Sequence, residues 1–83
     1  MDDHRERIRA FLLRHLGTAD LNDRDDIFTL GFVNSLFAMQ MLAWIEREFE
    51  IEITDDDLEI RNFNSVQAIH ALVRRKTGAA IEV

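Results

Sequence analysis

The chain of 83 residues contains no cysteine. It can therefore form no disulfide and offers no thiolate to a metal ion, so the fold depends on an apolar core. It also has no thiol of its own to acylate, and any thiol chemistry has to come from a cofactor. A chain of this length makes one domain, residues 1–83, which buries roughly 60% of its unfolded surface and leaves little room for a large enclosed pocket.

Positive charge is also scarce, because 10 Lys and Arg stand against 16 Asp and Glu, giving a formal net charge of -6. This argues against a nucleic-acid binder, which needs a basic face, and makes a basic partner surface the natural complement. No apolar run approaches the roughly 20 residues of a membrane span, and the first residues lack the features of an export signal. We therefore expect a soluble, cytoplasmic protein that binds neither nucleic acid nor membrane.

Apolar residues recur at helical spacing, and strand-like alternation of any length is missing. The last predicted helix faces inward through Val66, Ile69, Leu72 and Val73. Ser65 is its expected cap, and Gly17 is the expected end of the first helix. The predicted helices cover residues 3–16, 35–50, 55–61 and 65–77. The predicted fold class is all-α: a small four-helix bundle of three main helices and one short helix, with a long loop between the first two.

The second predicted helix, which has no glycine or proline, carries two apolar stripes about 120° apart. One stripe, expected to face the core, consists of Met39, Leu42, Ile45 and Phe49, and the other of Phe37, Met41 and Trp44. Two interpretations of the second stripe stay open. Either the helix is central and touches two neighbours, or exposed aromatic and Met side chains there bind partner proteins.

Ser35 follows a glycine-containing loop at the start of this second predicted helix. Both Asn34 and Ser35 are good N-cap residues, so an ordinary capping serine is one interpretation. The other is functional: a hydroxyl there would be exposed near the positive end of the helix dipole and suited to carry a phosphate ester. Gly31 would let the preceding loop turn sharply without crowding that hydroxyl.

Four motifs in order along the chain resemble the acyl carrier protein family, which includes the peptidyl carrier domains. They are Phe28-x-Leu30-Gly31 at the end of an acidic loop, Asn34-Ser35-Leu36, Ile45-Glu46-x-x-Phe49-x-Ile51-x-Ile53, and Phe63-Asn64-Ser65-Val66. The resemblance covers essentially the whole chain. It implies that Ser35 receives 4′-phosphopantetheine from coenzyme A, and that the thiol of this covalent cofactor carries acyl groups as thioesters. The implied protein is a non-catalytic phosphoprotein that separate enzymes modify and load.

Residues 31–38 look most like free-standing carriers of hydroxymalonyl- or methoxymalonyl-type extender units for polyketide synthases, as in antibiotic biosynthesis. The implied partners are a phosphopantetheinyl transferase, an acyl-loading enzyme, tailoring enzymes and a polyketide synthase acyltransferase. One departure from the family is Asn34, where Asp is usual. Asn caps a helix as well as Asp does, but it carries no negative charge for a modifying enzyme to use.

The residues expected to dock these partners lie on the second predicted helix or directly before it. They are Asn34, Leu36, Phe37, Gln40, Met41, Trp44, Arg47 and Glu48. Two rival functions remain open: a peptidyl or aminoacyl carrier with the same arm and another cargo, and an unmodified helical adaptor for protein partners. We expect a monomer.

Neither a metal site nor an enzyme active site is expected. Asp55, Asp56 and Asp57 lack the spacing and the glycine of an EF-hand loop and are typical of a helix start. The histidines, at positions 4, 15 and 70, have no partner at i, i+4 spacing for zinc. No nucleophile, base and oxyanion-binding set can be assembled from these residues.

Overall fold

The structure is a computed structural model that describes residues 4–17, 21–31 and 33–77. These residues form three α-helices and two short 3-10 turns, without a strand among them, so the predicted all-α class is confirmed. The helices are α1 (His4–Leu16), α2 (Ser35–Phe49) and α3 (Val66–Thr77), and the turns are η1 (Asp55–Asp57) and η2 (Ile60–Asn62). None of the helices seen in this part of the chain is long and apolar enough to cross a bilayer.

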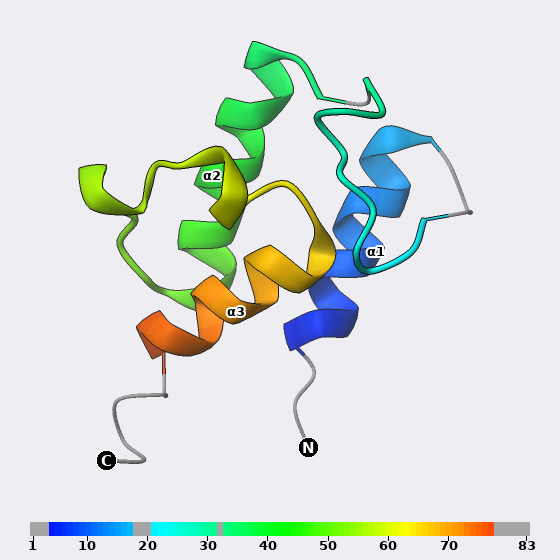
Figure 1. Ribbon diagram of the computed structural model, residues 1–83. Coiled ribbons are helices and arrows are strands. Elements are labelled where there is room, and N and C mark those ends of the chain that lie inside the picture. Colours follow the sequence, from blue (N-terminus) through cyan, green and yellow to red (C-terminus); the bar gives the residue numbers. More distant parts are fainter. Residues whose placement is uncertain (1–3, 18–20, 32, 78–83) are drawn as a thin grey trace.

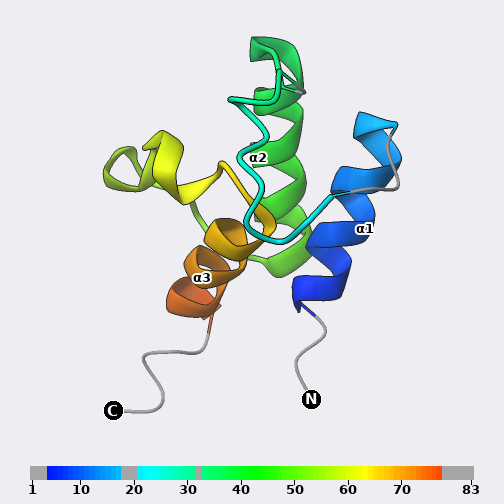
Figure 2. The ribbon, with the colours of Figure 1, turned by 45° about the vertical axis from the view of Figure 1, so that its right-hand side comes forward.

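The three helices surround one core. Helices α1 and α2 lie side by side, and α3 crosses at one end of the pair (Figure 1). The turned view in Figure 2 shows the first turn of α2 at the opposite end of the molecule from α3. This end of α2 is where the sequence predicts the functional hydroxyl, so the core of the bundle lies away from it.

The core consists of thirteen apolar side chains that are almost completely buried. They are Ile8, Phe11, Leu12, Leu21, Ile27, Met41, Ile45, Phe49, Phe63, Val66, Ile69, Leu72 and Val73. Complete burial of such a side chain is worth about 1.5–3 kcal/mol. The four inward-facing residues predicted for the last helix all belong to this core, which confirms that prediction. The predicted cap is also confirmed, because the hydroxyl of Ser65 accepts the N–H of Ala68 at 3.0 Å.

The acidic loop before α2 is held against the core by both its side chains and its backbone. Leu21 and Ile27 are buried at 1% and 0% exposure. The N–H of Ile27 donates to the carbonyl of Asn64 at 2.8 Å, and the N–H of Gln67 donates to the carbonyl of Asp23 at 2.9 Å. The loop is therefore bonded to the start of α3, which fixes the direction in which the chain enters α2.

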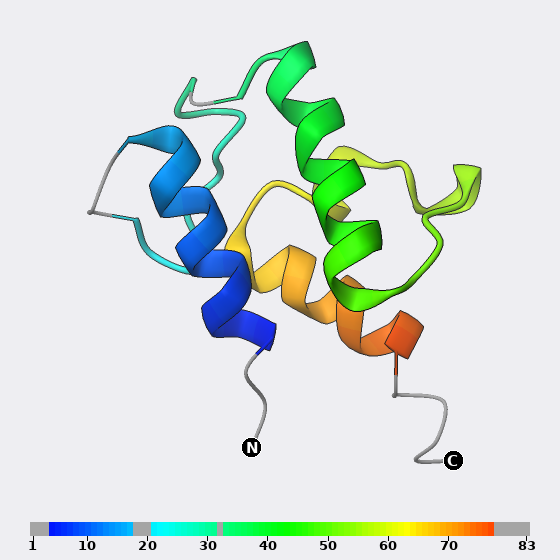
Figure 3. The same cartoon turned by 180° about the vertical axis from the view of Figure 1, so that it is seen from behind.

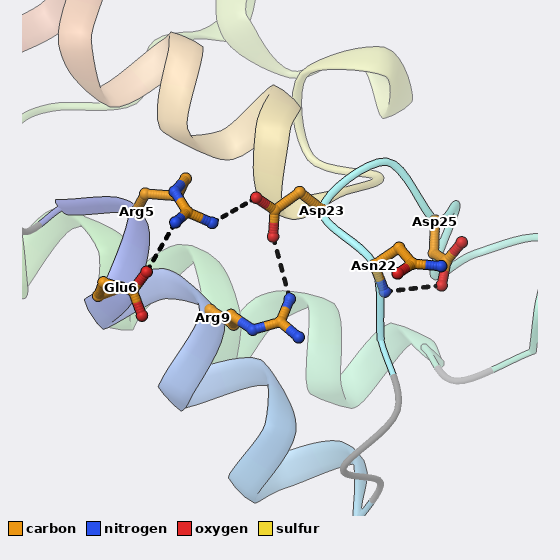
Figure 4. A network of polar contacts seen from close by, with 6 residues as sticks. All are labelled: Arg5, Glu6, Arg9, Asn22, Asp23 and Asp25. Atoms are coloured by element: carbon orange, nitrogen blue, oxygen red, sulfur yellow. Dashed lines mark hydrogen bonds and ion pairs between the residues drawn. The ribbon is translucent and has the colours of Figure 1, made fainter.

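Charged groups bond the same loop to α1 (Figure 4). Arg5 and Arg9 both donate to the carboxylate of Asp23, with 3.0 Å between Arg9 Nη1 and Asp23 Oδ1. Arg5 also reaches Glu6 at 2.7 Å, and the Asn22 N–H donates to Asp25 at 2.9 Å. Asp23 thus holds the loop to α1 by its side chain and to α3 by its carbonyl.

The predicted short helix over residues 55–61 is confirmed only in part, because two separate 3-10 turns occupy this stretch in place of one continuous helix. In a continued α-helix the carbonyl of Asp57 would accept the N–H of Arg61. Here it accepts the N–H of Glu59 at 2.9 Å and the side-chain amide of Asn62 at 2.8 Å instead. These local bonds end the first turn before a regular helix can form.

One residue of the stripe expected to face the core is exposed. Met39 has 70% of its surface exposed, so this prediction is wrong. In α2 the core stripe is Met41, Ile45 and Phe49, which recur every four residues. At 100° per residue Met39 lies about 120° from Ile45, outside the buried arc.

An ion pair joins the 3-10 region to the end of α3 and predicts an acid-sensitive stability. Lys76 Nζ lies 2.5 Å from Asp57 Oδ2, and this bond, followed by the one from the Thr54 N–H, lowers the pKa of Asp57 from 3.8 to about 2. The folded state prefers the ionised carboxylate, so the contribution is present above pH 4 and is lost as the pH falls toward 2. Asp57→Asn should lower stability at pH 7 and flatten its decline between pH 4 and 2, measured by urea unfolding.

The control for this measurement is Asp55→Asn, an exposed carboxylate with no ion pair in the region that the structure describes. It should keep the wild-type pH dependence. A wild-type acid limb in Asp57→Asn would mean that the pair with Lys76 contributes nothing to stability.

Candidate attachment site

Helix α2 is capped by Asn34 and not by Ser35. Asn34 has an extended backbone (φ -111, ψ 179), and its side-chain oxygen accepts the N–H of Phe37 at 2.8 Å. Its carbonyl accepts the N–H of Ala38 at 2.9 Å. Ser35 is consequently the first helical residue, and the interpretation of it as an ordinary capping serine is wrong.

The hydroxyl of Ser35 is accessible and uncommitted. Ser35 is exposed, and no hydrogen bond of its side chain is found within residues 4–17, 21–31 and 33–77. Because Asn34 supplies the cap, the helix does not need this hydroxyl for its own stability. It can therefore be esterified without breaking a contact of the fold.

The loop before α2 brings the chain to Ser35 through two defined turns. The Asp26 carboxylate accepts the N–H groups of Phe28 and Thr29, both at 3.0 Å. The bond from the Thr29 N–H is the main reason why the pKa of Asp26 is lowered. Gly31 then has a φ of +82, with its N–H bonded to the carbonyl of Phe28 at 3.1 Å. This left-handed backbone suits glycine, so the predicted sharp turn at Gly31 is confirmed. The next residue, Phe32, lies outside the described residues.

The first turn of α2 offers a favourable environment for an anion. The N–H groups of Ser35 and Leu36 have no carbonyl four residues earlier within the helix, and the positive end of the helix dipole lies beside them. This turn contains no acidic residue. A phosphate ester on Ser35 would thus lie next to donor N–H groups without a neighbouring carboxylate in the same turn, and the residues fit such a group.

The predicted docking residues fall into three groups. Phe37 and Trp44 are half-buried against α1, with their rings stacked on Phe11 at centroid distances of 6.0 Å and 4.2 Å. Met41 is only 1% exposed and belongs to the core, so its placement on a surface stripe was wrong. The remaining five residues are exposed: Asn34, Leu36, Gln40, Arg47 and Glu48. The interpretation of α2 as a central helix with two neighbours therefore holds for the aromatic pair.

Sequence reasoning missed Met39 as a surface residue. It is 70% exposed, and Leu36, one turn earlier, is 67% exposed. The spacing of the apolar residues could have predicted this exposure. Phe49, Ile45 and Met41 recur in steps of four residues along one line of the helix, and Met39 does not lie on that line. An apolar pair, Leu36 and Met39, thus lies directly after Ser35 on the outside of the helix.

An apolar groove runs along the other side of α2, between this helix and the 3-10 turns. Its volume is about 170 Å³. The residues that line it are Phe28, Ala38, Met41, Leu42, Leu58, Glu59, Ile60 and Phe63. Ala38 lies three positions after Ser35, so one end of the groove is close to the first turn of α2. In the described part of the chain no cluster of three or more His, Asp or Glu side chains is placed to hold a metal ion.

This geometry agrees with the comparison to known families. The family model for the phosphopantetheine attachment site matches residues 6–73, and the chain belongs to this family. Members bind 4′-phosphopantetheine covalently, so the predicted cofactor is confirmed.

A search of solved structures supports the same fold. One chain in the crystal structure of Bradyrhizobium japonicum glycine:[carrier protein] ligase complexed with its cognate carrier protein and an analogue of glycyl adenylate has a TM-score of 0.76 and 20% sequence identity. The superposition covers 90% of this chain and 100% of that one. No curated protein matches the sequence.

The different burial of two methionines in α2 gives a stability prediction. Met41→Ala should lower the free energy of unfolding by about 2–5 kcal/mol, because it removes a side chain from the closed core. Met39→Ala, the matched control on the outside of the same helix, should change it by less than about 0.5 kcal/mol. Both are measured by chemical denaturation, and equal losses would contradict the orientation of α2 described above.

Proposed function

We propose that this protein is a non-catalytic acyl carrier in which Ser35 carries 4′-phosphopantetheine. The observation that carries the proposal is the exposed, uncommitted hydroxyl at the first position of α2, released from capping by Asn34. The family assignment supplies the cofactor, and among the described residues this hydroxyl meets both requirements, accessibility and a helix N-terminus that favours a phosphate.

The chain's own residues act by positioning. Asn34 holds the first turn, so the N–H groups of Ser35 and Leu36 face the position of the phosphate. Ser35 has no hydrogen-bonded base within the part that the structure describes, so the transferase has to accept the proton of the hydroxyl. Once attached, the cofactor supplies a flexible arm with a terminal thiol for thioester formation, which makes up for the absence of cysteine. Tethering then keeps the cargo at high local concentration for each enzyme in turn.

For the cargo, we propose a hydroxymalonyl- or methoxymalonyl-type extender unit for a polyketide synthase, as the sequence around Ser35 suggests. The partners would be the phosphopantetheinyl transferase, an acyl-loading enzyme, tailoring enzymes and a synthase acyltransferase. These enzymes would meet the carrier at the exposed residues of α2 around Ser35. The apolar groove beside α2 offers a place for a short acyl chain.

A second candidate is an aminoacyl carrier with the same arm. The structural neighbour supports it, because that protein is the cognate carrier of a glycine:[carrier protein] ligase. Its 20% identity limits the likeness to the fold, so the acyl carrier remains our first proposal. The unmodified adaptor is disfavoured by the phosphopantetheine family match.

The attachment is tested by mass spectrometry of the intact protein. Incubation with coenzyme A and a broad-specificity phosphopantetheinyl transferase should add the mass of one phosphopantetheine to the wild type and nothing to Ser35→Ala. Ser65→Ala, which removes the buried capping hydroxyl of α3, is the matched control and should still be modified where it folds. Equal modification of Ser35→Ala would disprove the assignment.

The cargo is tested on protein isolated from the cells that make it naturally. Mild base should release the thioester-bound acid, and we expect a substituted malonate. Release of an amino acid would favour the second candidate. A third result, no thioester-bound acid in protein that carries the arm at Ser35, would contradict both cargo proposals and leave the attachment site intact.

A further inference from the structure

The outer face of α3 is positively charged, although the chain as a whole is acidic. Helix α3 contains none of the 16 Asp and Glu residues of the sequence. The side chains that point away from the core fall within one arc of about 140°. They form the outer face of α3 and are Gln67, His70, Ala71, Arg74 and Arg75. Lys76 lies outside this arc and pairs with Asp57, so the charge of the outer face comes from the two arginines.

The same five residues surround a hollow of about 360 Å³. Ala71 is short and exposed, and the longer side chains of the other four stand around it. The guanidinium groups of Arg74 and Arg75 and the amide of Gln67 all carry N–H donors. A guanidinium group binds a carboxylate by two parallel hydrogen bonds, and this pairing is stronger than a bond between neutral groups. The hollow therefore suits an acidic side chain from another molecule.

The carboxylates on segments that pack against α3 leave this charge in place. Three of them are engaged with other cations: Asp23 with Arg5 and Arg9, Asp57 with Lys76, and Glu59 with Arg61. Arg75 bonds a neutral group, the side-chain oxygen of Asn62, at 3.5 Å and keeps its full charge.

The exposed carboxylates between α2 and α3 lie on other sides of α3. Glu50 and Glu52 directly follow α2, which contacts α3 from the core side. Asp55 and Asp56 belong to η1 beside Asp57, and thus to the side of α3 that presents Lys76. An acidic group that approaches the outer face of α3 from solvent consequently meets arginine first.

This face lies far from the attachment site. Figures 1 and 3 view the molecule from opposite sides, and in both α3 lies at the lower end and the first turn of α2 at the upper end. Ser35 begins α2 at that upper end. A molecule bound to the outer face of α3 therefore leaves Ser35 open to solvent.

We propose that the outer face of α3 is a separate interaction surface, which binds an acidic segment of a partner protein while Ser35 stays uncovered. The partner places a carboxylate in the hollow beside Arg74 and Arg75, and a hydrogen-bonding group about 10 Å along the helix, opposite Gln67. Two arginines are fewer than the four to eight cations typical of a site for anionic lipids, and they form no extended basic face for nucleic acid. The inference goes beyond the proposed function, because such a partner holds the carrier in place without touching its reactive end.

The test uses the ¹⁵N-labelled full chain bearing phosphopantetheine, with two synthetic helical peptides as probes. The peptides share one alanine-rich sequence, and one carries Glu where the other carries Lys. At low salt the Glu peptide should shift the amide signals of residues 67–75 and leave those of residues 35–40 in place. The Lys peptide should leave residues 67–75 unshifted. Added salt should weaken the binding of the Glu peptide, since both partners are exposed.

Two double variants separate the outer face of α3 from net charge and from the helix dipole. Arg74→Gln with Arg75→Gln should weaken the Glu peptide about fivefold, because two exposed charge contacts are lost. Arg14→Gln with Arg47→Gln is the matched control: it removes the same charge from exposed residues in the last turns of α1 and α2. Its affinity should stay at the wild-type value. If the first double variant loses helical circular dichroism, Arg75→Gln alone should still weaken the peptide about twofold.

Three results would overturn the inference. They are a Glu peptide that leaves residues 67–75 unshifted, an equal loss of affinity in both double variants, and shifts at residues 35–40 that show the peptide on the attachment site. A fourth, sedimentation of the protein with phosphatidylserine vesicles that is lost on replacing Arg74 and Arg75, would assign this face to a membrane instead. Modification of Ser35 is read separately from the intact mass, and with an unmodified chain the titration decides the same question.

Discussion

The rotation of α2 about its own axis determines what its residues can do. Burial of Met41, Ile45 and Phe49 fixes this rotation, because a helix has to turn its most apolar line toward the core. With that line inside, Trp44 lies against Phe11 of α1, and Met39 is left in solvent. A turn of the helix by one residue in either direction would bring Glu46 or Glu48 onto the buried line, so few other orientations are compatible with this sequence.

The use of Asn34 as the cap separates two demands that meet at the start of α2. A helix start needs a side-chain oxygen to satisfy the N–H of Phe37, and a carrier needs a hydroxyl that is free to form an ester. Adjacent residues divide these tasks, and Ser35 is left at the first helical position. The neutral amide of Asn34 caps without adding negative charge beside the phosphate position. The cap of α2 therefore makes no use of the Ser35 hydroxyl.

The sequence was sufficient for the three main helix-forming segments, but less so for the surface. The inward residues of α3 repeat cleanly at helical spacing and were predicted in full. The periodicity of α2 is ambiguous, because almost every residue in its first half is apolar, and contacts with α1 and α3 decided which stripe was buried. One continuous helix over residues 55–61 does not form, because the side-chain amide of Asn62, five residues after Asp57, donates to the Asp57 carbonyl. That carbonyl would accept a backbone N–H in a continued helix.

Net charge and local charge lead to different expectations about partners, and distance decides between them. The surplus of carboxylates creates a long-range field, but at physiological salt it is screened beyond about 8 Å. Within a docked interface the groups in contact dominate, and the exposed side chains of α2 after Ser35 include the apolar Leu36 and Met39 as well as Arg47. The negative surplus can therefore guide the approach of a partner, whereas the selection between partners depends on the side chains that are in contact once the two surfaces have met.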